Sequence, residues 1–204
     1  MIQNRKNYVG SLTSGALLGV ETRLLLPYLR LDLLEKEWEI LFEKENLLQK
    51  KTVNTSMRYM RTIKKRFAVL GDHRNEFIED LINSDREEFN QLILLLIILN
   101  SPIVADFMLN IIKQHTRFID EALSDNAWSE FIEDRLSFVP DLAEYSESTL
   151  KKIGATVINI LTEVGYFNNT KEKKLQTVYI TDLLKKWLRI LNKEGLREVF
   201  ECTM

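Results

Sequence analysis

The sequence predicts an all-α, multi-helix protein in two lobes. The N-terminal lobe, residues 1–122, contains a helix-turn-helix, and the C-terminal lobe, residues 123–204, is winged-helix-like and carries a short β-ribbon. Only seven glycines and three prolines interrupt 204 residues, of which 45% are hydrophobic and 28% charged, the composition of a soluble globular protein. Apolar residues recur at spacings of three and four through most of the chain. One stretch alone, LQTVYI, has the composition of a strand.

Two helices open the N-terminal lobe. The first begins near Leu17, is expected to be capped by Thr13 or Ser14, and stops near Pro27. The second covers about residues 33–48 and carries glutamates on its solvent side. Its apolar stripe consists of Leu34, Trp38, Leu41, Phe42 and Leu48. Both helices therefore have one face for the core and one for solvent.

A basic helix follows after the break QKKTVNT and is expected to end before Gly71. At about 100° per residue its apolar side chains share one sector, and Arg58, Arg61 and Lys65 fall on the opposite side. The apolar sector consists of Met57, Met60, Ile63, Phe67 and Leu70. The helix is therefore expected to bury one stripe and to present three long cations on an outward ridge.

This helix concentrates positive charge in a chain that is otherwise acidic. Residues 50–66 contain seven basic and no acidic side chains, so the formal net charge of -2 leaves -9 for the rest of the chain. Lys64 and Arg66 are expected at the two edges of the ridge (its shoulders). A local patch of this kind suits the neutralisation of phosphates. A solvated basic face is the ordinary alternative, and a membrane-surface helix is disfavoured because the apolar stripe is needed for the core.

The second helix, the break and the basic helix have the order of a helix-turn-helix, at about residues 33–70. In that motif the second helix enters the major groove of DNA, and its first residues contact base edges. Arg61 and Lys65, further along, are better placed to hold phosphates. The base-edge contacts expected at the start of the helix are Asn54, Thr55, Ser56 and Arg58, with Lys51 as a further DNA contact beside them. Because most of these cations suit phosphates, little sequence preference is expected.

An aliphatic run, LILLLIIL at residues 92–99, predicts a buried helix that begins at Asp85. A membrane span needs about 20 apolar residues, so the run is too short, and no membrane association is expected. The next helix has Pro102 in its first turn, where proline is tolerated, and reaches His115.

Shorter helices make up the C-terminal lobe: Asn126–Leu136, Thr149–Val164 and a last one ending at about Leu191. Between the last two, a turn at Asn168 and Asn169 precedes LQTVYI, so helix, turn and ribbon have the outline of a winged helix. The second of these helices offers an additional expected DNA contact, for which an ordinary solvated face is the alternative. Its outward residues are Lys151, Lys152 and Asn159, and the wing adds Lys171, Lys173 and Lys174.

Residue patterns for catalysis are missing from the sequence. His73 and His115 stand far apart, with no cysteine or carboxylate at metal-ligand spacing, and no glycine-rich phosphate loop occurs. We therefore expect no enzymatic activity, no metal and no cofactor. The single cysteine, Cys202, allows no intramolecular disulfide, which fits a cytoplasmic location. Nothing in the chain indicates a dimer interface, so a monomer is expected.

The order of these motifs resembles the BrxA family. The resemblance starts with YVGSLTSGALLGVETRLLL, continues with Trp38 and ENLLQKKTVNTSMRYMRTIKKRF, and includes SESTLKKIGATVINILTEVGYF near the C-terminus. The matching positions are Ser14–Leu17 with Glu21 and Thr22, and then Asn46, Leu48 and Gln49. The resemblance covers nearly the whole chain, although residues 73–118 match only in being hydrophobic and helical.

Proteins like this belong to BREX (bacteriophage exclusion) loci, beside a methyltransferase, an ATPase and a phosphatase-like protein, and are small helical proteins that bind double-stranded DNA. The resemblance therefore implies a non-enzymatic DNA-binding component of a phage-defence system, with the other BREX proteins as partners. Two alternatives stay open. One is a scaffold whose basic face docks an acidic protein partner. The other is a transcriptional regulator of its own locus, which would need a strong preference for one sequence.

Overall fold

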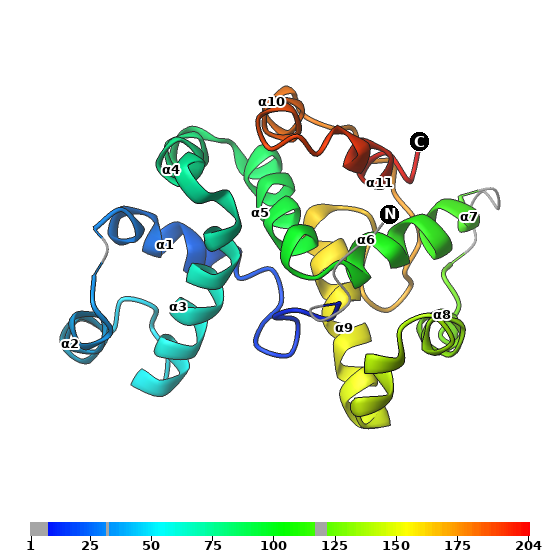
Figure 1. Ribbon diagram of the computed structural model, residues 1–204, viewed down its shortest axis with the longest axis horizontal. Helices are drawn as coiled ribbons and strands as arrows, with labels where there is room; N and C mark the ends of the chain where they lie inside the picture. Colours follow the sequence, from blue (N-terminus) through cyan, green and yellow to red (C-terminus); the bar gives the residue numbers. More distant parts are fainter. Residues whose placement is uncertain (1–7, 32, 117–121) are drawn as a thin grey trace.

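The computed structural model describes residues 8–31, 33–116 and 122–204, and every regular element in these ranges is helical (Figure 1). The prediction of an all-α protein is confirmed. The elements of the first half are α1 (Gly19–Leu29), α2 (Glu35–Glu45), α3 (Val53–Phe67), η2 (Ala68–His73), α4 (Arg74–Asn83) and α5 (Arg86–Asn100). Those of the second half are α6 (Ile103–Phe107), η3 (Met108–Ile112), α7 (Lys113–His115), α8 (Ala127–Leu136), η4 (Pro140–Glu144), α9 (Glu147–Val164), α10 (Asp182–Ile190), η5 (Glu194–Leu196) and α11 (Arg197–Phe200).

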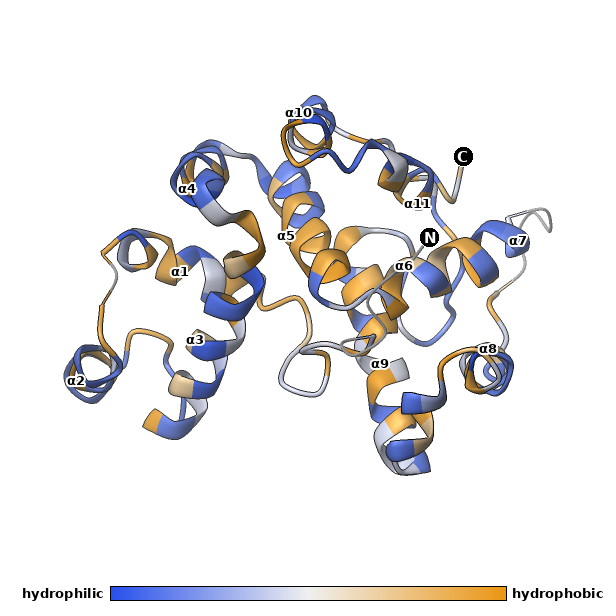
Figure 2. Ribbon diagram, viewed as in Figure 1, coloured by the Kyte–Doolittle hydropathy of each residue, from blue (hydrophilic) through white to orange (hydrophobic). Residues whose placement is uncertain are grey.

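Helix α5 is the centre of the molecule. It packs against α1, α3 and α4 on one side and against α6, α9 and α10 on the other, and Figure 1 shows it between the two groups. Every side chain from Leu92 to Ile98 is buried, and Figure 2 shows this helix as mainly hydrophobic. The predicted start is confirmed, because Asp85 Oδ1 accepts a hydrogen bond from the Glu88 N–H at 2.9 Å. The helix therefore forms the core that both ends of the molecule share.

The aliphatic run lies inside this core. In the described ranges no single helix is long and apolar enough to cross a membrane. By length and composition alone, α5 together with the segment Ile103–His115 passes such a test as a pair bent by 106°.

The start of α1 differs from the prediction. The helix begins at Gly19 after Leu18, which has a left-handed backbone (φ 58°), so neither Thr13 nor Ser14 caps it. The preceding residues instead form turns whose carbonyl groups point toward α3 and accept hydrogen bonds there. The helix also continues two residues past Pro27, because a proline in the last turn removes only one main-chain hydrogen bond.

Two helices predicted in the C-terminal lobe are confirmed by α8 and α9. Ser146 caps α9 through its Oγ, and Gly165 ends it with a left-handed backbone (φ 103°). The two helices approach closely at Gly154, where an added Cβ atom would lie 2.5 Å from the Trp128 ring. The Trp128 Nε1–H donates to the Leu150 carbonyl at 2.9 Å, which fixes the ring against α9.

The predicted β-ribbon is not confirmed. Phe167 and Leu175 form an isolated antiparallel bridge, and Ala122 and Lys174 form another, but the described residues contain no regular strand. The extended stretch after Leu175 is hydrogen-bonded by side chains instead of by a second strand. Thr203 Oγ1 accepts from the Val178 N–H at 3.1 Å, and the Gln91 side chain bonds the main chain at Tyr179 and Thr181. The winged-helix description and the lobe boundary at residues 122 and 123 stay predictions, and the adjoining residues 117–121 lie outside the described ranges.

Candidate nucleic-acid interface

Helix α3 forms where the sequence predicts a basic helix, but it ends at Phe67, and Leu70 and Gly71 lie in the 3-10 helix η2 that follows. Thr52 caps α3, accepting a hydrogen bond from the Thr55 N–H at 3.2 Å. All five predicted stripe residues are buried: Met57, Met60, Ile63, Phe67 and Leu70. Arg58, Arg61 and Lys65 are exposed on the opposite side, which confirms the outward ridge. Helix α2 packs against α3, and residues 46–52 connect them.

The residues expected at the start of α3 have different surroundings. Lys51 and Asn54 are exposed. Thr55 is half-buried, and its hydroxyl lies 3.0 Å from that of Thr52 as part of the helix cap. Ser56 is only 1% exposed, so its assignment as a DNA contact is wrong. The reason lies in the helical period, which places Ser56 on the same face as Met60 and Ile63.

Arg66 is also placed differently from the prediction. It is 2% exposed instead of standing on the shoulder of the ridge. Its guanidinium donates to the carbonyl oxygens of Gly15 at 3.1 Å, Ala16 at 2.7 Å and Leu17 at 2.8 Å. Burial lowers the pKa of Arg66 to about 10. The segment before α1 therefore covers one shoulder of α3, and Arg66 holds that segment in place.

Carboxylates from other helices pair with two further cations. The Nζ of Lys50 lies 2.7 Å from Glu21 Oε1. Arg61 donates to both carboxylate oxygens of Glu35, at 2.9 and 3.3 Å, and this contact holds the pKa of Glu35 below its usual range. Sequence reasoning missed both pairs, because Glu21 and Glu35 lie on other helices and look like ordinary surface glutamates.

Four cations on or beside α3 stay available to a ligand. In the part of the chain that the structure describes, they make no hydrogen bond or ion pair with a carboxylate. The four are Lys51, Arg58, Lys64 and Lys65. The Arg58 guanidinium lies 5.3 Å from the centre of the Tyr59 ring, a cation–π contact that leaves its donors free. Lys51, Arg58 and Lys65 are exposed and Lys64 is half-buried, and we call these four cations the α3 cationic face.

The predicted second contact on α9 is separate from this face. Lys151, Lys152 and Asn159 are exposed, as expected, but Figure 1 shows α9 at the other side of α5 from α3. The Lys151 Nζ lies 2.6 Å from Glu147 one turn earlier. In the predicted wing, Lys173 pairs with Asp125. The structure therefore does not bring the two predicted contacts into one surface, and carboxylates partly neutralise the second.

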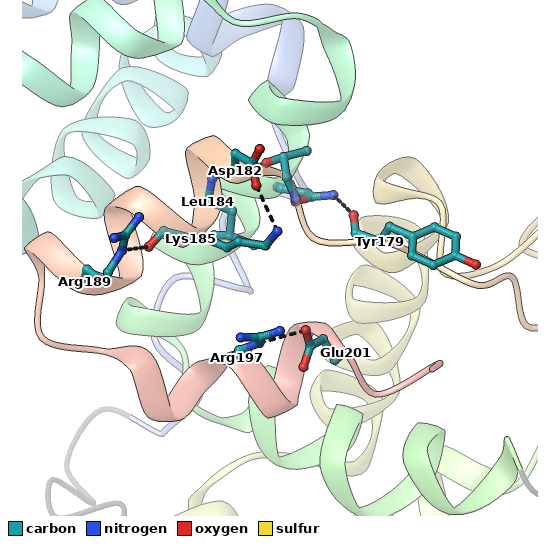
Figure 3. A network of polar contacts seen from close by, with 9 residues as sticks. Tyr179, Asp182, Leu184, Lys185, Arg189, Arg197 and Glu201 are labelled. Carbon is teal, nitrogen blue, oxygen red and sulfur yellow. Dashed lines mark hydrogen bonds and ion pairs between the residues drawn. The ribbon is translucent and has the colours of Figure 1, made fainter.

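Another group of cations, which the sequence did not single out, lies around α10 and α11. Lys185, Arg189 and Arg197 line a cavity of about 360 Å³. Figure 3 shows Lys185 turned toward Asp182, at 2.9 Å, and Arg197 turned toward Glu201, at 2.8 Å. Two of the three positive charges are thus paired with carboxylates nearby. The cavity therefore has a weaker attraction for anions than the α3 cationic face.

Catalytic and metal-binding groups do not gather at any of these surfaces. Within residues 8–31, 33–116 and 122–204, no three His, Cys, Asp or Glu side chains are grouped as ligands for a metal ion. Cys202 is fully buried, and burial raises the pKa of its thiol to about 12. His73 packs edge-on against Trp187, with ring centres 6.4 Å apart.

Comparison with known proteins identifies the family. The family model of BrxA matches residues 6–192. The chain is 32% identical to the BREX protein BrxA of Escherichia coli O9:H4 (strain HS) over 201 residues, which covers 98% of this chain and 93% of that protein. It is 24% identical to the BREX protein BrxA of Paramagnetospirillum magneticum (strain ATCC 700264 / AMB-1), with 92% of each chain covered.

A solved structure shares the fold. A crystal structure of an uncharacterized protein from Magnetospirillum magneticum aligns with a TM-score of 0.81 at 22% identity, covering 96% of this chain and 99% of that one. The fold likeness and the family match both span nearly the whole chain. The protein belongs to the BrxA family.

Proposed function

We propose that this protein is a double-stranded-DNA-binding component of a BREX phage-defence system and that the α3 cationic face is its main contact with the duplex. Its BrxA relatives carry the name of BREX proteins, which supports a place in such a system. The observation that carries the DNA-binding proposal is the set of four cations on and beside α3 that have no carboxylate partner among the described residues. Cations that are not already paired can replace the counterions of a phosphate backbone.

The arrangement of α2 and α3 supports a helix-turn-helix mode of binding. The two helices pack together, and the outward side of α3 is exposed over its whole length. The connection at residues 46–52 is longer than the usual turn of about 3–4 residues, so the geometry is a variant of the motif. The major groove, about 12 Å wide, admits one α-helix. In this orientation Asn54 and Arg58 face base edges, and Lys51 faces phosphates.

Binding by this face is largely independent of sequence. Lysine is a point charge that suits phosphates, whereas specific readout relies on bidentate contacts such as those of arginine with guanine. Arg58 is the only arginine in the α3 cationic face. In this proposal the protein holds DNA without catalysis of its own. It does so as a monomer in the cytoplasm, alongside other BREX proteins.

Fluorescence anisotropy with two labelled 30-mer duplexes of unrelated sequence tests this function. Across a salt series, four phosphate contacts predict a slope of log K against log salt between about -3 and -4, equal for both duplexes. A strong preference for one duplex would favour a regulator of the locus. Failure to bind either duplex at low salt would contradict the proposal. It would favour the alternative in which the α3 cationic face binds an acidic protein partner.

A further inference from the structure

An apolar groove lies between α8, η4 and the first turn of α9. It encloses about 400 Å³. Its apolar lining consists of Trp128, Ile132, Leu136, Leu142, Tyr145 and Leu150. Leu136 and Tyr145 are 37% and 36% exposed, and the neighbouring Phe138 is 60% exposed. These side chains form an accessible apolar surface that the described residues leave uncovered.

The walls of this groove are held by the core. Trp128 packs against Gly154 and donates to the Leu150 carbonyl, so it cannot swing out without losing both contacts. On its other side, its ring lies 5.2 Å from that of Phe107, centre to centre. Ser146 caps α9 directly below the lining residue Leu150. A groove with fixed walls is preformed, and a ligand does not have to order it.

The charge around the groove is negative. Residues 127–152 contain six acidic and three basic side chains, a formal balance of -3. Arg135 adds little positive charge to the surface because it is mostly buried and lies 2.8 Å from Asp106 and 3.0 Å from Asp134. Among the charged lining residues, Glu133 makes no ion pair with any cation in the described ranges, whereas Lys151 is paired with Glu147.

This combination of shape and charge selects the kind of occupant. A nucleic acid or an anionic membrane surface is repelled by carboxylates, and neither would use an apolar groove of this size. The α3 cationic face of a second copy has the complementary charge, but it offers no large exposed aliphatic side chain. A protein segment with one or two large apolar side chains flanked by lysine or arginine satisfies both features.

We propose that the α8–α9 groove docks a basic, apolar-anchored segment of a protein partner. The segment inserts its apolar side chains between Trp128 and Leu142, and its cations face Glu133 and the other carboxylates of α8 and η4. Figure 1 shows α8 and α3 on opposite sides of α5, so the groove and the α3 cationic face can be occupied at the same time. This docking function goes beyond DNA binding and does not depend on it.

A labelled amphipathic peptide of leucine and lysine is the probe for this proposal, measured by anisotropy with the full chain. Its charge-inverted counterpart has glutamate at every lysine position. We expect saturable binding of the leucine–lysine peptide and no binding of the leucine–glutamate peptide. The double variant Leu136→Asn/Tyr145→Asn removes apolar anchoring without changing charge, and it should weaken binding about tenfold or more.

The matched control is Leu31→Asn/Tyr179→Asn, which makes the same changes at two other exposed sites and should leave peptide binding unchanged. Equal affinity of the two double variants would overturn the proposal, as would equal binding of the two peptides. A dimer in sedimentation that only the groove variant dissociates would assign the groove to a second copy and overturn the proposed occupant. Both variants should keep wild-type DNA affinity, so failure of the docking proposal is distinguishable from failure of DNA binding.

Discussion

Arg66 donates a hydrogen bond from Nη1 to the main-chain carbonyl oxygen of Leu17 at 2.8 Å, and this contact joins the C-terminal end of α3 to the segment before α1. Two further donors of the same guanidinium satisfy the carbonyls of Gly15 and Ala16. The residue is therefore a structural cation within a helix whose other cations face solvent. It fixes the position of α3 against the N-terminal segment.

Replacing Arg66 should consequently destabilise the protein. Arg66→Met keeps an unbranched side chain as far as the position of Nε but removes the guanidinium, which leaves three main-chain carbonyls without donors, and we expect a loss of about 3 kcal/mol. Urea denaturation followed by circular dichroism measures the change. Arg58→Met is the matched control, an exposed arginine of the same helix, and should change stability by less than about 0.5 kcal/mol. Similar unfolding midpoints for the two variants would rule out the structural role of Arg66.

Glu35 is expected to compete with DNA for Arg61. Glu35→Gln removes the carboxylate that holds Arg61 at 2.9 Å, so a fifth cation becomes available on α3. The pair is exposed and screened by solvent, so duplex affinity should rise only modestly, by up to about fivefold. Glu43→Gln on the same helix makes the same change in charge without releasing an arginine. If both variants gain affinity equally, the pairing of Arg61 has no part in binding.

The contact between Gly154 and Trp128 reverses the usual effect of adding a methyl group to a helical glycine. Alanine normally stabilises a helix relative to glycine by about 1 kcal/mol. At Gly154 the added carbon would lie 2.5 Å from the Trp128 ring, and Gly154→Ala should destabilise by about 1–3 kcal/mol. Gly19→Ala, whose added carbon meets no atom closer than 3.7 Å, should not destabilise. Thermal unfolding of both variants gives the comparison, and a stabilised Gly154→Ala would show that the groove wall is loose.

Cys202 should be inert in the folded protein. It is fully buried, and its thiol pKa, raised to about 12 by burial, keeps it protonated at neutral pH. The stability linked to this thiol is fully present below its ordinary pKa of about 9 and is lost as the pH rises toward 12. A thiol reagent such as Ellman's reagent should react only after denaturation. In a Cys202→Ser background, Met204→Cys at the exposed C-terminus should react at once, and fast reaction of native Cys202 would show that the tail opens.

Local periodicity made part of this structure predictable. The buried stripe of α3 and its opposite ridge follow from the helical repeat alone, because both are properties of one helix. The same repeat places Ser56 at the centre of the stripe. The helical period alone therefore indicates that Ser56 is buried and does not contact DNA. Which shoulder of α3 is covered was not predictable, since Arg66 meets carbonyls about 50 residues away in sequence.

Tertiary contacts explain the other differences. The ion pairs that reduce the free charge of α3 join residues 26 and 29 positions apart, and no pattern within one helix indicates them. The strand-like composition of LQTVYI led to a predicted ribbon, but side chains of Gln91 and Thr203 bond its main chain and no second strand is paired with it. The acidic groove combines α8, η4 and α9, and its apolar lining becomes visible only when these elements are packed.

The central claim is that the α3 cationic face holds duplex DNA. The most direct test is the salt dependence of binding for Arg58→Glu/Lys65→Glu, with Arg86→Glu/Lys193→Glu as a control that makes the same change in net charge at exposed sites on α5 and after α10. All variants should give the circular dichroism spectrum of the wild type. We predict that the first variant loses at least about 100-fold in affinity and that its salt slope falls by about two units, whereas the control keeps the wild-type slope. Wild-type affinity and slope in the Arg58→Glu/Lys65→Glu variant would contradict the account.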